Sequence, residues 1–186
     1  GMYLVTFQPY SDGPTFVQRA YRRGGWDAVN YLYARPPTTS SQIIHPDRYP
    51  ETGVTRPRVT DRTRGSWARI EVENHPNHVE LVEVGANAML VYPSYDSGRE
   101  TQIVPLQHFV NTRDGSVDQF DPLNYDHRYT AGISGDRLVP YRNDAGQTGY
   151  VWVLAFDGQT EAREFRTGYR ELLRYHDATE ADAEGP

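Results

Sequence analysis

The sequence predicts an α+β fold, in which an antiparallel sheet carries helices packed on one face of a single domain. Two runs of alternating hydrophobic and polar side chains, residues 137–142 and 149–156, flank a short polar turn, which is the pattern of a β-hairpin. An amphipathic segment, residues 161–176, follows at once, and its apolar stripe can dock on that hairpin. We therefore expect this hairpin and this helix to form the centre of the fold.

The N-terminal region predicts one short strand and then a helix. Residues 3–7 are rich in β-branched and aromatic side chains, which favours a strand. The Gly-Pro pair at 13–14 is expected to begin the first helix, because proline is favoured at the first helical position. The glycine pair at 24–25 then interrupts the helical pattern. We expect Trp26 to pack closely against these glycines and to be buried.

A second helix is predicted between this interruption and the diproline at 36–37. Four residues at spacings of three and four form one of its sides: Trp26, Val29, Asn30 and Tyr33. Residues 39–42 have the pattern of a capping box for one more short helical turn, which Pro46 ends. From residue 50 to residue 66 the chain is rich in Thr, Arg and Pro, which predicts an irregular excursion.

The middle of the chain carries weaker patterns. Residues 67–73 alternate as a strand does. Residues 79–92 alternate in their first half, but their Ala, Met and Leu content favours a helix. Residues 102–110 are expected to be extended.

The C-terminal helix is the clearest predicted element. Thr160 is expected to cap it. Its buried stripe should consist of residues at helical spacing: Ala162, Phe165, Tyr169, Leu172 and Leu173. Each large member of the stripe contributes roughly 1.5–3 kcal/mol when it is fully buried. We expect the domain to cover residues 1–177, and residues 178–186 to form a disordered acidic tail.

The composition excludes several kinds of site. The chain has no cysteine, so it cannot form disulfides, thiolate metal sites or iron–sulfur clusters. It also has no lysine, which excludes a Schiff base on lysine and the lysine of a P-loop. The formal net charge of −6 argues against nucleic acid as a partner. No run of residues approaches the roughly 18 apolar residues of a membrane span.

Short motifs are spread over nearly the whole chain: PY..G..FV at 9–17, GGW.AV at 24–29, PP and HP..Y at 36–49, and GDR, A.EF and LL at 135–173. With these motifs the sequence resembles a family of haloarchaeal surface proteins or lipoproteins of unassigned function. It also resembles the distal half of bacterial zinc-metallopeptidase-like proteins. Ser41 departs from the family pattern, which tends to have Glu there. The H-E-x-x-H helix of the peptidase-like relatives lies upstream of this region, and this chain contains no such motif.

The resemblance implies a non-catalytic domain of a surface-associated protein. It implies a location at the cell surface or otherwise outside the cytoplasm. It also implies a partner, either an upstream peptidase-like region or another protein.

A compact polar set follows the aromatic helix. His45, Asp47 and Tyr49 could supply an acid–base pair, but a structural corner fixed by Pro46 is the simpler interpretation. Further along the chain, Asp136 and Arg137 are most simply either a local charge pair or the hydrogen-bonded start of a strand. Together with Trp26 and Asn30, these residues are the candidate binding residues.

The histidines predict no metal site. His75 and His78 flank a turn that contains proline, and no acidic residue has a matching spacing. Asp126 and His127 are adjacent, and adjacent side chains usually diverge. We therefore expect no cofactor, no metal and no catalytic residue, although a site assembled from distant residues stays open.

Three functions remain open. The first is the non-catalytic domain of a surface protein. The second is a binding module in which tyrosine and tryptophan side chains line a cleft for a peptide, a glycan or a small ligand. The third is a hydrolase, which a cleft at His45 with a strongly shifted carboxylate would favour.

Overall fold

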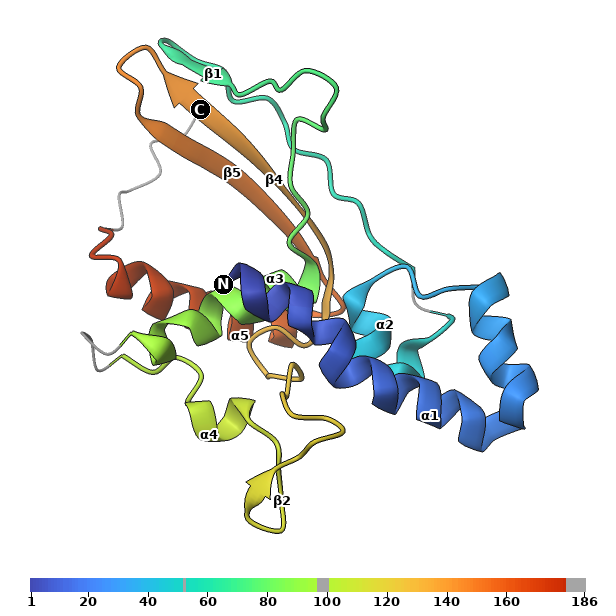
Figure 1. The fold of residues 1–186 in the computed structure, drawn as a ribbon. Helices are drawn as coiled ribbons and strands as arrows, with labels where there is room; N and C mark the ends of the chain where they lie inside the picture. The colour runs from blue at the N-terminus through green and yellow to red at the C-terminus, as the bar shows by residue number, and fades with distance from the viewer. Residues whose placement is uncertain (52, 97–100, 180–186) are drawn as a thin grey trace.

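Helices surround the base of a long β-hairpin that stands out from them (Figure 1). The computed structural model describes residues 1–51, 53–96 and 101–179. The helices of the described residues are α1 (Met2–Ala34), α2 (Ser40–Ile44), η1 (Pro46–Arg48), α3 (Val82–Val91), η2 (Tyr92–Tyr95), α4 (Leu106–Phe109) and α5 (Gln159–Tyr175). The strands are β1 (Trp67–Arg69), β2 (Thr112–Arg113), β3 (Ser116–Val117), β4 (Ile133–Asn143) and β5 (Thr148–Phe156).

The predicted hairpin is confirmed as β4 and β5, which pair antiparallel with Leu138 opposite Trp152. The strand β1 adds to the other edge of β4, so the order of the sheet is β1-β4-β5. Pro140 lies within β4, where it has no N–H to donate, and its carbonyl accepts a hydrogen bond from the Ile70 amide. The short strands β2 and β3 form a separate antiparallel pair.

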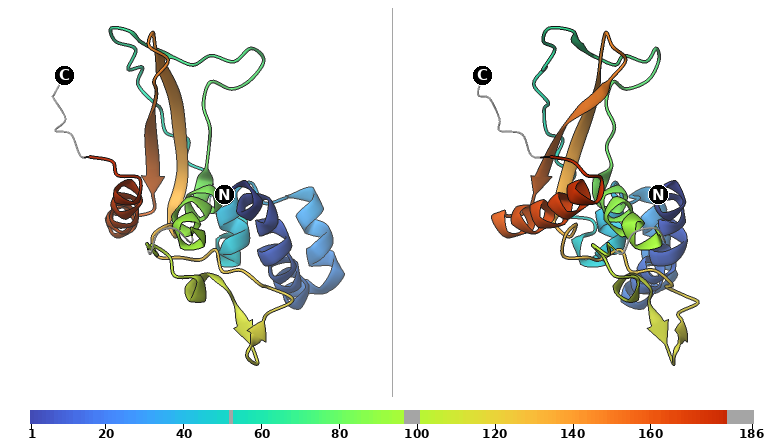
Figure 2. Two further views of the ribbon diagram at one scale, coloured as in Figure 1. Left: turned by 60° about the vertical axis from the view of Figure 1, so that its left-hand side comes forward. Right: turned by 90° about the vertical axis from the view of Figure 1, so that its left-hand side faces the viewer.

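Helix α5 packs on the face of β5 that carries Trp152 and Phe156, as the amphipathic stripe predicts. The ring of Phe165 lies 5.5 Å from the rings of both Trp152 and Phe156, measured between centroids. Ala86 of α3 joins the same hydrophobic cluster, so α3 and α5 meet at the base of the hairpin (Figure 2). The predicted α+β fold in a single domain is confirmed.

The helix α5 begins two residues earlier than predicted, and Thr160 is not its cap. Gly158 occupies the N-cap position in an extended conformation, because the chain turns immediately after β5 ends. Of the predicted stripe, Phe165 and Leu172 are buried, while the other members are half-buried: Ala162, Tyr169 and Leu173.

Helix α3 lies at the centre of the main hydrophobic core. Its residues Leu90 and Val91 are completely buried, and they belong to one cluster with Phe109, Tyr125 and Leu172. The prediction of a helix over 79–92 is confirmed for residues 82–91.

The alternation in the first half of 79–92 also has a structural counterpart. Val79 forms an antiparallel bridge with Leu138 of β4, and each backbone amide donates to the other's carbonyl at 2.8 Å.

Two predictions for the N-terminal region are wrong. Residues 3–7 are helical, because Leu4, Gln8 and Ser11 are buried at helical spacing. Tyr3 and Phe7, four residues apart, also stack along the helix at 5.5 Å. The Gly-Pro pair at 13–14 lies inside α1 and does not begin it.

The predicted interruption at the glycine pair is confirmed. Gly24 and Gly25 have non-helical backbone angles, so α1 consists of two arms, residues 2–23 and 26–34. We call this bent helix the α1 elbow (Figure 1). The second arm is followed by the predicted short helical turn, with Thr39 as N-cap and the Gln42 side chain accepting from the Thr38 amide at 2.7 Å.

The polar excursion after residue 50 packs along β4 (Figure 1). The Thr55 amide donates to the Ser134 carbonyl at 2.8 Å, and the Arg62 amide donates to the Tyr141 hydroxyl at 3.0 Å. Gly135 permits this approach, since a Cβ there would lie 1.8 Å from the Thr55 carbonyl oxygen.

Three further boundaries differ from the predictions or lie beyond the described residues. The strand predicted over 67–73 covers only residues 67–69. Residues 102–110 are not extended throughout, because α4 begins after Pro105. Of the predicted tail, residues 180–186 lie outside the described residues.

Candidate functional site

Trp26 is 69% exposed, so the prediction that it is buried is wrong. The reason lies in the backbone of Gly25, whose φ of 62° turns the second arm of the α1 elbow. A Cβ on Gly25 would meet no atom within 4 Å, so this glycine provides a backbone angle and not room for the indole. The indole instead lies on the outside of the elbow, edge-on to the ring of Tyr21 at 5.3 Å.

Three hollows with mostly apolar walls flank the α1 elbow. The inner pocket, of about 430 Å³, is lined by Phe16, Arg19, Ala20, Arg23, Ala28, Tyr31, Leu32, Pro46, Tyr49 and Pro50. The outer groove, of about 700 Å³, is lined by Pro9, Gly13, Pro14, Phe16, Val17, Val29, Leu32, Tyr33, Pro36, Pro37 and Ile43. The Trp26 hollow, of about 310 Å³, is lined by Pro14, Val17, Gln18, Tyr21, Trp26, Val29 and Phe120.

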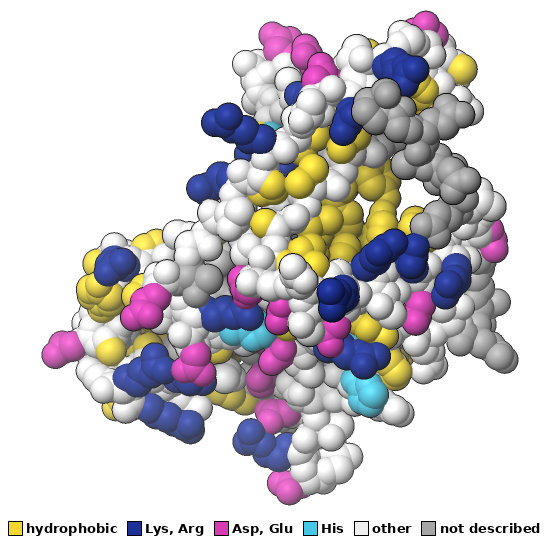
Figure 3. Space-filling view, turned by 180° about the vertical axis from the view of Figure 1, so that it is seen from behind, with side chains coloured by type: hydrophobic (Ala, Val, Ile, Leu, Met, Phe, Trp, Pro, Cys, Tyr) yellow, Lys and Arg dark blue, Asp and Glu magenta, His cyan; other side chains and the backbone are white. Residues whose placement is uncertain are grey.

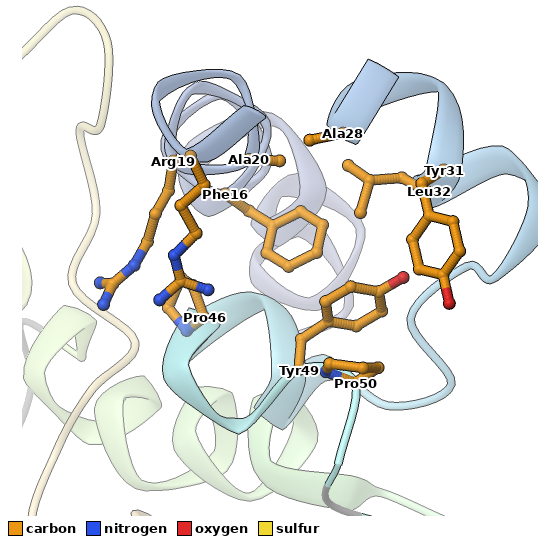
Figure 4. A pocket seen from close by; sticks show the side chains of 10 residues that line it. Phe16, Arg19, Ala20, Ala28, Tyr31, Leu32, Pro46, Tyr49 and Pro50 are labelled. Carbon is orange, nitrogen blue, oxygen red and sulfur yellow. The ribbon is translucent and has the colours of Figure 1, made fainter. Parts of the chain in front are cut away.

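The inner pocket lies between the two arms of the elbow and the segment that follows α2 (Figure 4). The rings of Phe16 and Tyr49 meet edge to face at 5.4 Å and form its floor. Arg19 and Arg23 line the same pocket, and both guanidinium groups contact the carboxylate of Asp47. The arrangement can therefore hold an apolar group and an anionic group side by side.

The structure divides the polar set predicted at 45–49. Tyr49 lines the inner pocket and donates a hydrogen bond to the Arg35 carbonyl, and Asp47 binds the two arginines of that pocket. His45 instead contacts Glu83 of α3. His45 and Asp47 therefore contact different partners. Asn30 is exposed on the second arm and lines none of the three hollows.

His45 joins α2 to α3 through a mostly buried ion pair. Its Nε2 lies 2.7 Å from Oε1 of Glu83, and its Nδ1 lies 3.7 Å from Oδ2 of Asp126. Burial alone would lower the pKa of His45, but the hydrogen bond and the charge of Glu83 outweigh burial and raise it. Glu83 was missed from the sequence, although an acidic residue between two valines of an apolar helix was a usable signal.

Asp12 is a second buried acid, and it lies close enough to Glu83 for the charge of Glu83 to raise its pKa. Burial, together with the smaller effects of the Asp121 and Glu83 charges, raises the pKa of Asp12 to about 7, even though a hydrogen bond from Gln8 lowers it. His45 and Asp12 are therefore two mostly buried side chains whose pKa values are raised, and the charge of Glu83 acts on both.

Asp136 and Arg137 do not form the predicted local charge pair. They are neighbours on β4, so their side chains point to opposite faces of the sheet. The buried carboxylate of Asp136 accepts from the amides of Leu81 and Val82 and from the Trp152 indole N–H. This residue therefore holds the start of α3 against the hairpin. Arg137 lies on the other face, and its Nη2 is 3.6 Å from Glu80 Oε1.

Within residues 1–51, 53–96 and 101–179, no three His, Asp or Glu side chains are grouped as a metal ion would require. In the same described ranges, no helix has the length and apolar character needed to cross a membrane.

Comparison with known proteins assigns the chain to a family. A family model described as a domain of unknown function (DUF8575) matches residues 69–185, which extend from the end of β1 past α5. No curated protein and no solved structure matches the chain. Since the matched residues make up more than half of the sequence, the chain belongs to the family DUF8575.

Proposed function

We propose that this chain is a non-catalytic binding module whose α1 elbow binds an apolar, acidic segment of a partner protein. The observation that carries the proposal is the exposure of large apolar side chains around the two arms. They are Tyr10, Val17, Tyr21, Trp26, Tyr31 and Tyr33. Grouped exposed apolar surface of this kind marks interaction sites in soluble proteins.

The residue types also favour a binding surface. Tryptophan and tyrosine combine a large apolar area with a polar tip, and they are enriched among the residues that dominate binding energies. Trp26 and Tyr21 lie edge to face beside the Trp26 hollow, so together they present one continuous aromatic surface.

The charge of the elbow favours an acidic partner. Residues 1–35 contain four arginines and two aspartates, a net charge of +2, whereas the whole chain has a net charge of −6. Arginine and hydrophobic side chains lie next to one another over the elbow, at the left of Figure 3. Complementary charge across an interface speeds association and fixes the orientation of the partner.

Two earlier expectations enter this proposal. The resemblance to surface proteins supports a module that acts outside the cytoplasm. The resemblance to the distal part of peptidase-like proteins supports a partner that is such a region or another protein. A hydrolase site at His45 is less well supported, because both ring nitrogens of His45 face carboxylates of its own fold.

The proposal can be tested with a fluorescein-labelled amphipathic peptide of about 15 residues, long enough for helix formation, composed of Leu, Phe and Glu. A matched peptide carries Lys in place of Glu. We expect fluorescence anisotropy to show that the acidic peptide binds more tightly than the basic one. Trp26→Ala should weaken this binding at least about tenfold, as expected for a dominant aromatic contact.

The control is Tyr92→Ala, which removes an exposed aromatic ring that lines none of the three hollows. Binding should be unchanged in this variant. The proposal fails if the wild type binds neither peptide, or if Trp26→Ala and Tyr92→Ala have equal effects.

A further inference from the structure

We infer that the inner pocket is an anchor site for a carboxylate attached to an apolar group, and that Asp47 occupies the place of this carboxylate until the ligand displaces it. The inference rests on the proposed function and specifies which part of the partner is recognised. It depends on the pair Arg19 and Arg23, on the apolar floor beneath them, and on the exposure of Asp47.

The two arginines converge on one oxygen atom. Arg19 and Arg23 lie four residues apart on the first arm of α1, so their side chains emerge on the same side of the helix. The Nη2 atoms of both residues contact Oδ1 of Asp47, and the Arg23 distance is 3.0 Å. Two guanidinium groups share one carboxylate, which leaves this trio with a net charge of +1. An anion is therefore the complementary ligand.

The floor of the pocket determines what the anion is attached to. Phe16, Ala20, Leu32 and Tyr49 line a volume of about 430 Å³ directly beside the guanidinium groups (Figure 4). This volume lies within the range of small-molecule sites, which are mostly apolar with a few polar groups that fix orientation. An aromatic or branched aliphatic group fits such a floor, and its carboxylate can then reach the arginines.

Asp47 is held weakly enough to be displaced. Its side chain is 70% exposed, and exposed ion pairs contribute only about 0.2–1 kcal/mol. A ligand that forms the same charge contacts and also buries an apolar group gains hydrophobic free energy that Asp47 does not provide. In the absence of a ligand, Asp47 reduces the repulsion between the two arginines.

The experiment uses a pair of probes of equal shape, 2-naphthylacetate and its neutral amide 2-naphthylacetamide, with affinities measured by calorimetry and chemical-shift titration. We expect the wild type to bind the carboxylate more tightly than the amide. Asp47→Asn should increase affinity for the carboxylate about tenfold and leave affinity for the amide unchanged, because it removes the internal competitor. Arg23→Gln and Arg19→Gln should each abolish the preference for the carboxylate.

Arg22→Gln is the matched control. Arg22 belongs to the same turn of α1, but it does not line the inner pocket, so both affinities should stay at wild-type values. Thermal unfolding of each variant shows whether it is folded, and a variant that is not folded is replaced by the other arginine variant.

The outcomes separate this inference from the proposed function. If the acidic peptide binds through Trp26 but is insensitive to Asp47→Asn and Arg23→Gln, the proposed function stands and the inference is overturned. If Asp47→Asn strengthens binding of 2-naphthylacetate while neither peptide binds, the anchor site stands and the peptide proposal fails. Equal affinity for carboxylate and amide, or no binding of either at ~5 mM, overturns the inference.

Discussion

His45 Nε2 lies 2.7 Å from Oε1 of Glu83, and the Glu83 side chain is completely buried. This contact joins the residue that ends α2 to the first turn of α3. A buried carboxylate without a partner is strongly destabilising, because the charge is removed from water and is not compensated. The pair therefore fixes the position of the elbow and α2 relative to the centre of the fold.

Replacing His45 by Ala should lower the free energy of unfolding by about 3–5 kcal/mol, because Glu83 is left buried without its cationic partner. Urea denaturation monitored by circular dichroism measures this change. The double variant His45→Ala, Glu83→Gln should recover part of the loss, since it removes the uncompensated charge. His78→Ala, at a half-buried histidine whose Nε2 lies 3.6 Å from Glu80, is the control and should change stability much less. If His45→Ala and His78→Ala lower the free energy of unfolding equally, the pair of His45 and Glu83 does not have this role.

The same pair predicts a pH dependence. The pKa of His45 is raised in the folded state, so protonation of His45 stabilises the fold. This contribution is fully present below the unfolded pKa of about 6.5 and is lost as the pH rises through the folded pKa above it. Unfolding at pH 6 and pH 9 should therefore show a smaller difference in His45→Gln than in the wild type. An unchanged difference would show that His45 does not titrate differently in the two states.

The raised pKa of Asp12 predicts a second pH dependence of stability, at lower pH than that of His45. The folded pKa of Asp12, about 7, exceeds the ordinary aspartate pKa of 3.8, so the folded state retains a proton that the unfolded state releases. Stability should fall as the pH rises from about 4 to 7, by an amount on the order of 4 kcal/mol at 1.36 kcal/mol per pH unit. Asp12→Asn should remove this slope and raise the melting temperature at pH 8. Asp27→Asn, exposed on the second arm, is the control and should leave the slope in place.

Local patterns predicted the hairpin and α5, because alternation and an amphipathic stripe are properties of neighbouring residues. The environment of Trp26 was not predictable in this way. The sequence shows two glycines, but it does not show that Gly25 adopts φ 62° and so places the indole outside.

The same limit applies to the N-terminus and to the candidate site. The composition of residues 3–7 favoured a strand, whereas the burial of Leu4 and Gln8 at helical spacing decides for a helix. The contacts of Asp47 with two arginines of α1 depend on how distant segments pack, and no spacing in the sequence encodes them.

Gly135 should be intolerant of any side chain. A Cβ there would lie 1.8 Å from the Thr55 carbonyl oxygen, which is backbone and cannot rotate away. Gly135→Ala should therefore displace the excursion after residue 50 from β4 and lower stability by about 1–3 kcal/mol, as overpacking does. Gly149→Ala on β5 is the matched control, because the nearest atom to its Cβ would be Trp67 Cζ3 at 3.4 Å. Chemical denaturation of both variants gives the comparison, and a Gly135→Ala protein as stable as Gly149→Ala would contradict the close packing.

The last prediction concerns the bend that exposes Trp26. Gly25 has φ 62° and ψ −152°, a region that is essentially restricted to glycine and costs other residues about 1–3 kcal/mol. Gly25→Ala should therefore lower the melting temperature or straighten the α1 elbow. A straightened elbow would change the walls of the three hollows, which both arms line. Gly24→Ala is the control, because Gly24 has an extended φ of −158° and its Cβ would only press on the Ala28 Cβ at 3.1 Å. Acrylamide quenching of tryptophan fluorescence, measured with Trp67 and Trp152 replaced by Phe in every variant, reports on the Trp26 indole, and it should change in Gly25→Ala more than in Gly24→Ala. If Gly25→Ala retains both the wild-type melting temperature and the wild-type quenching, the backbone angle of Gly25 does not determine the exposure of Trp26.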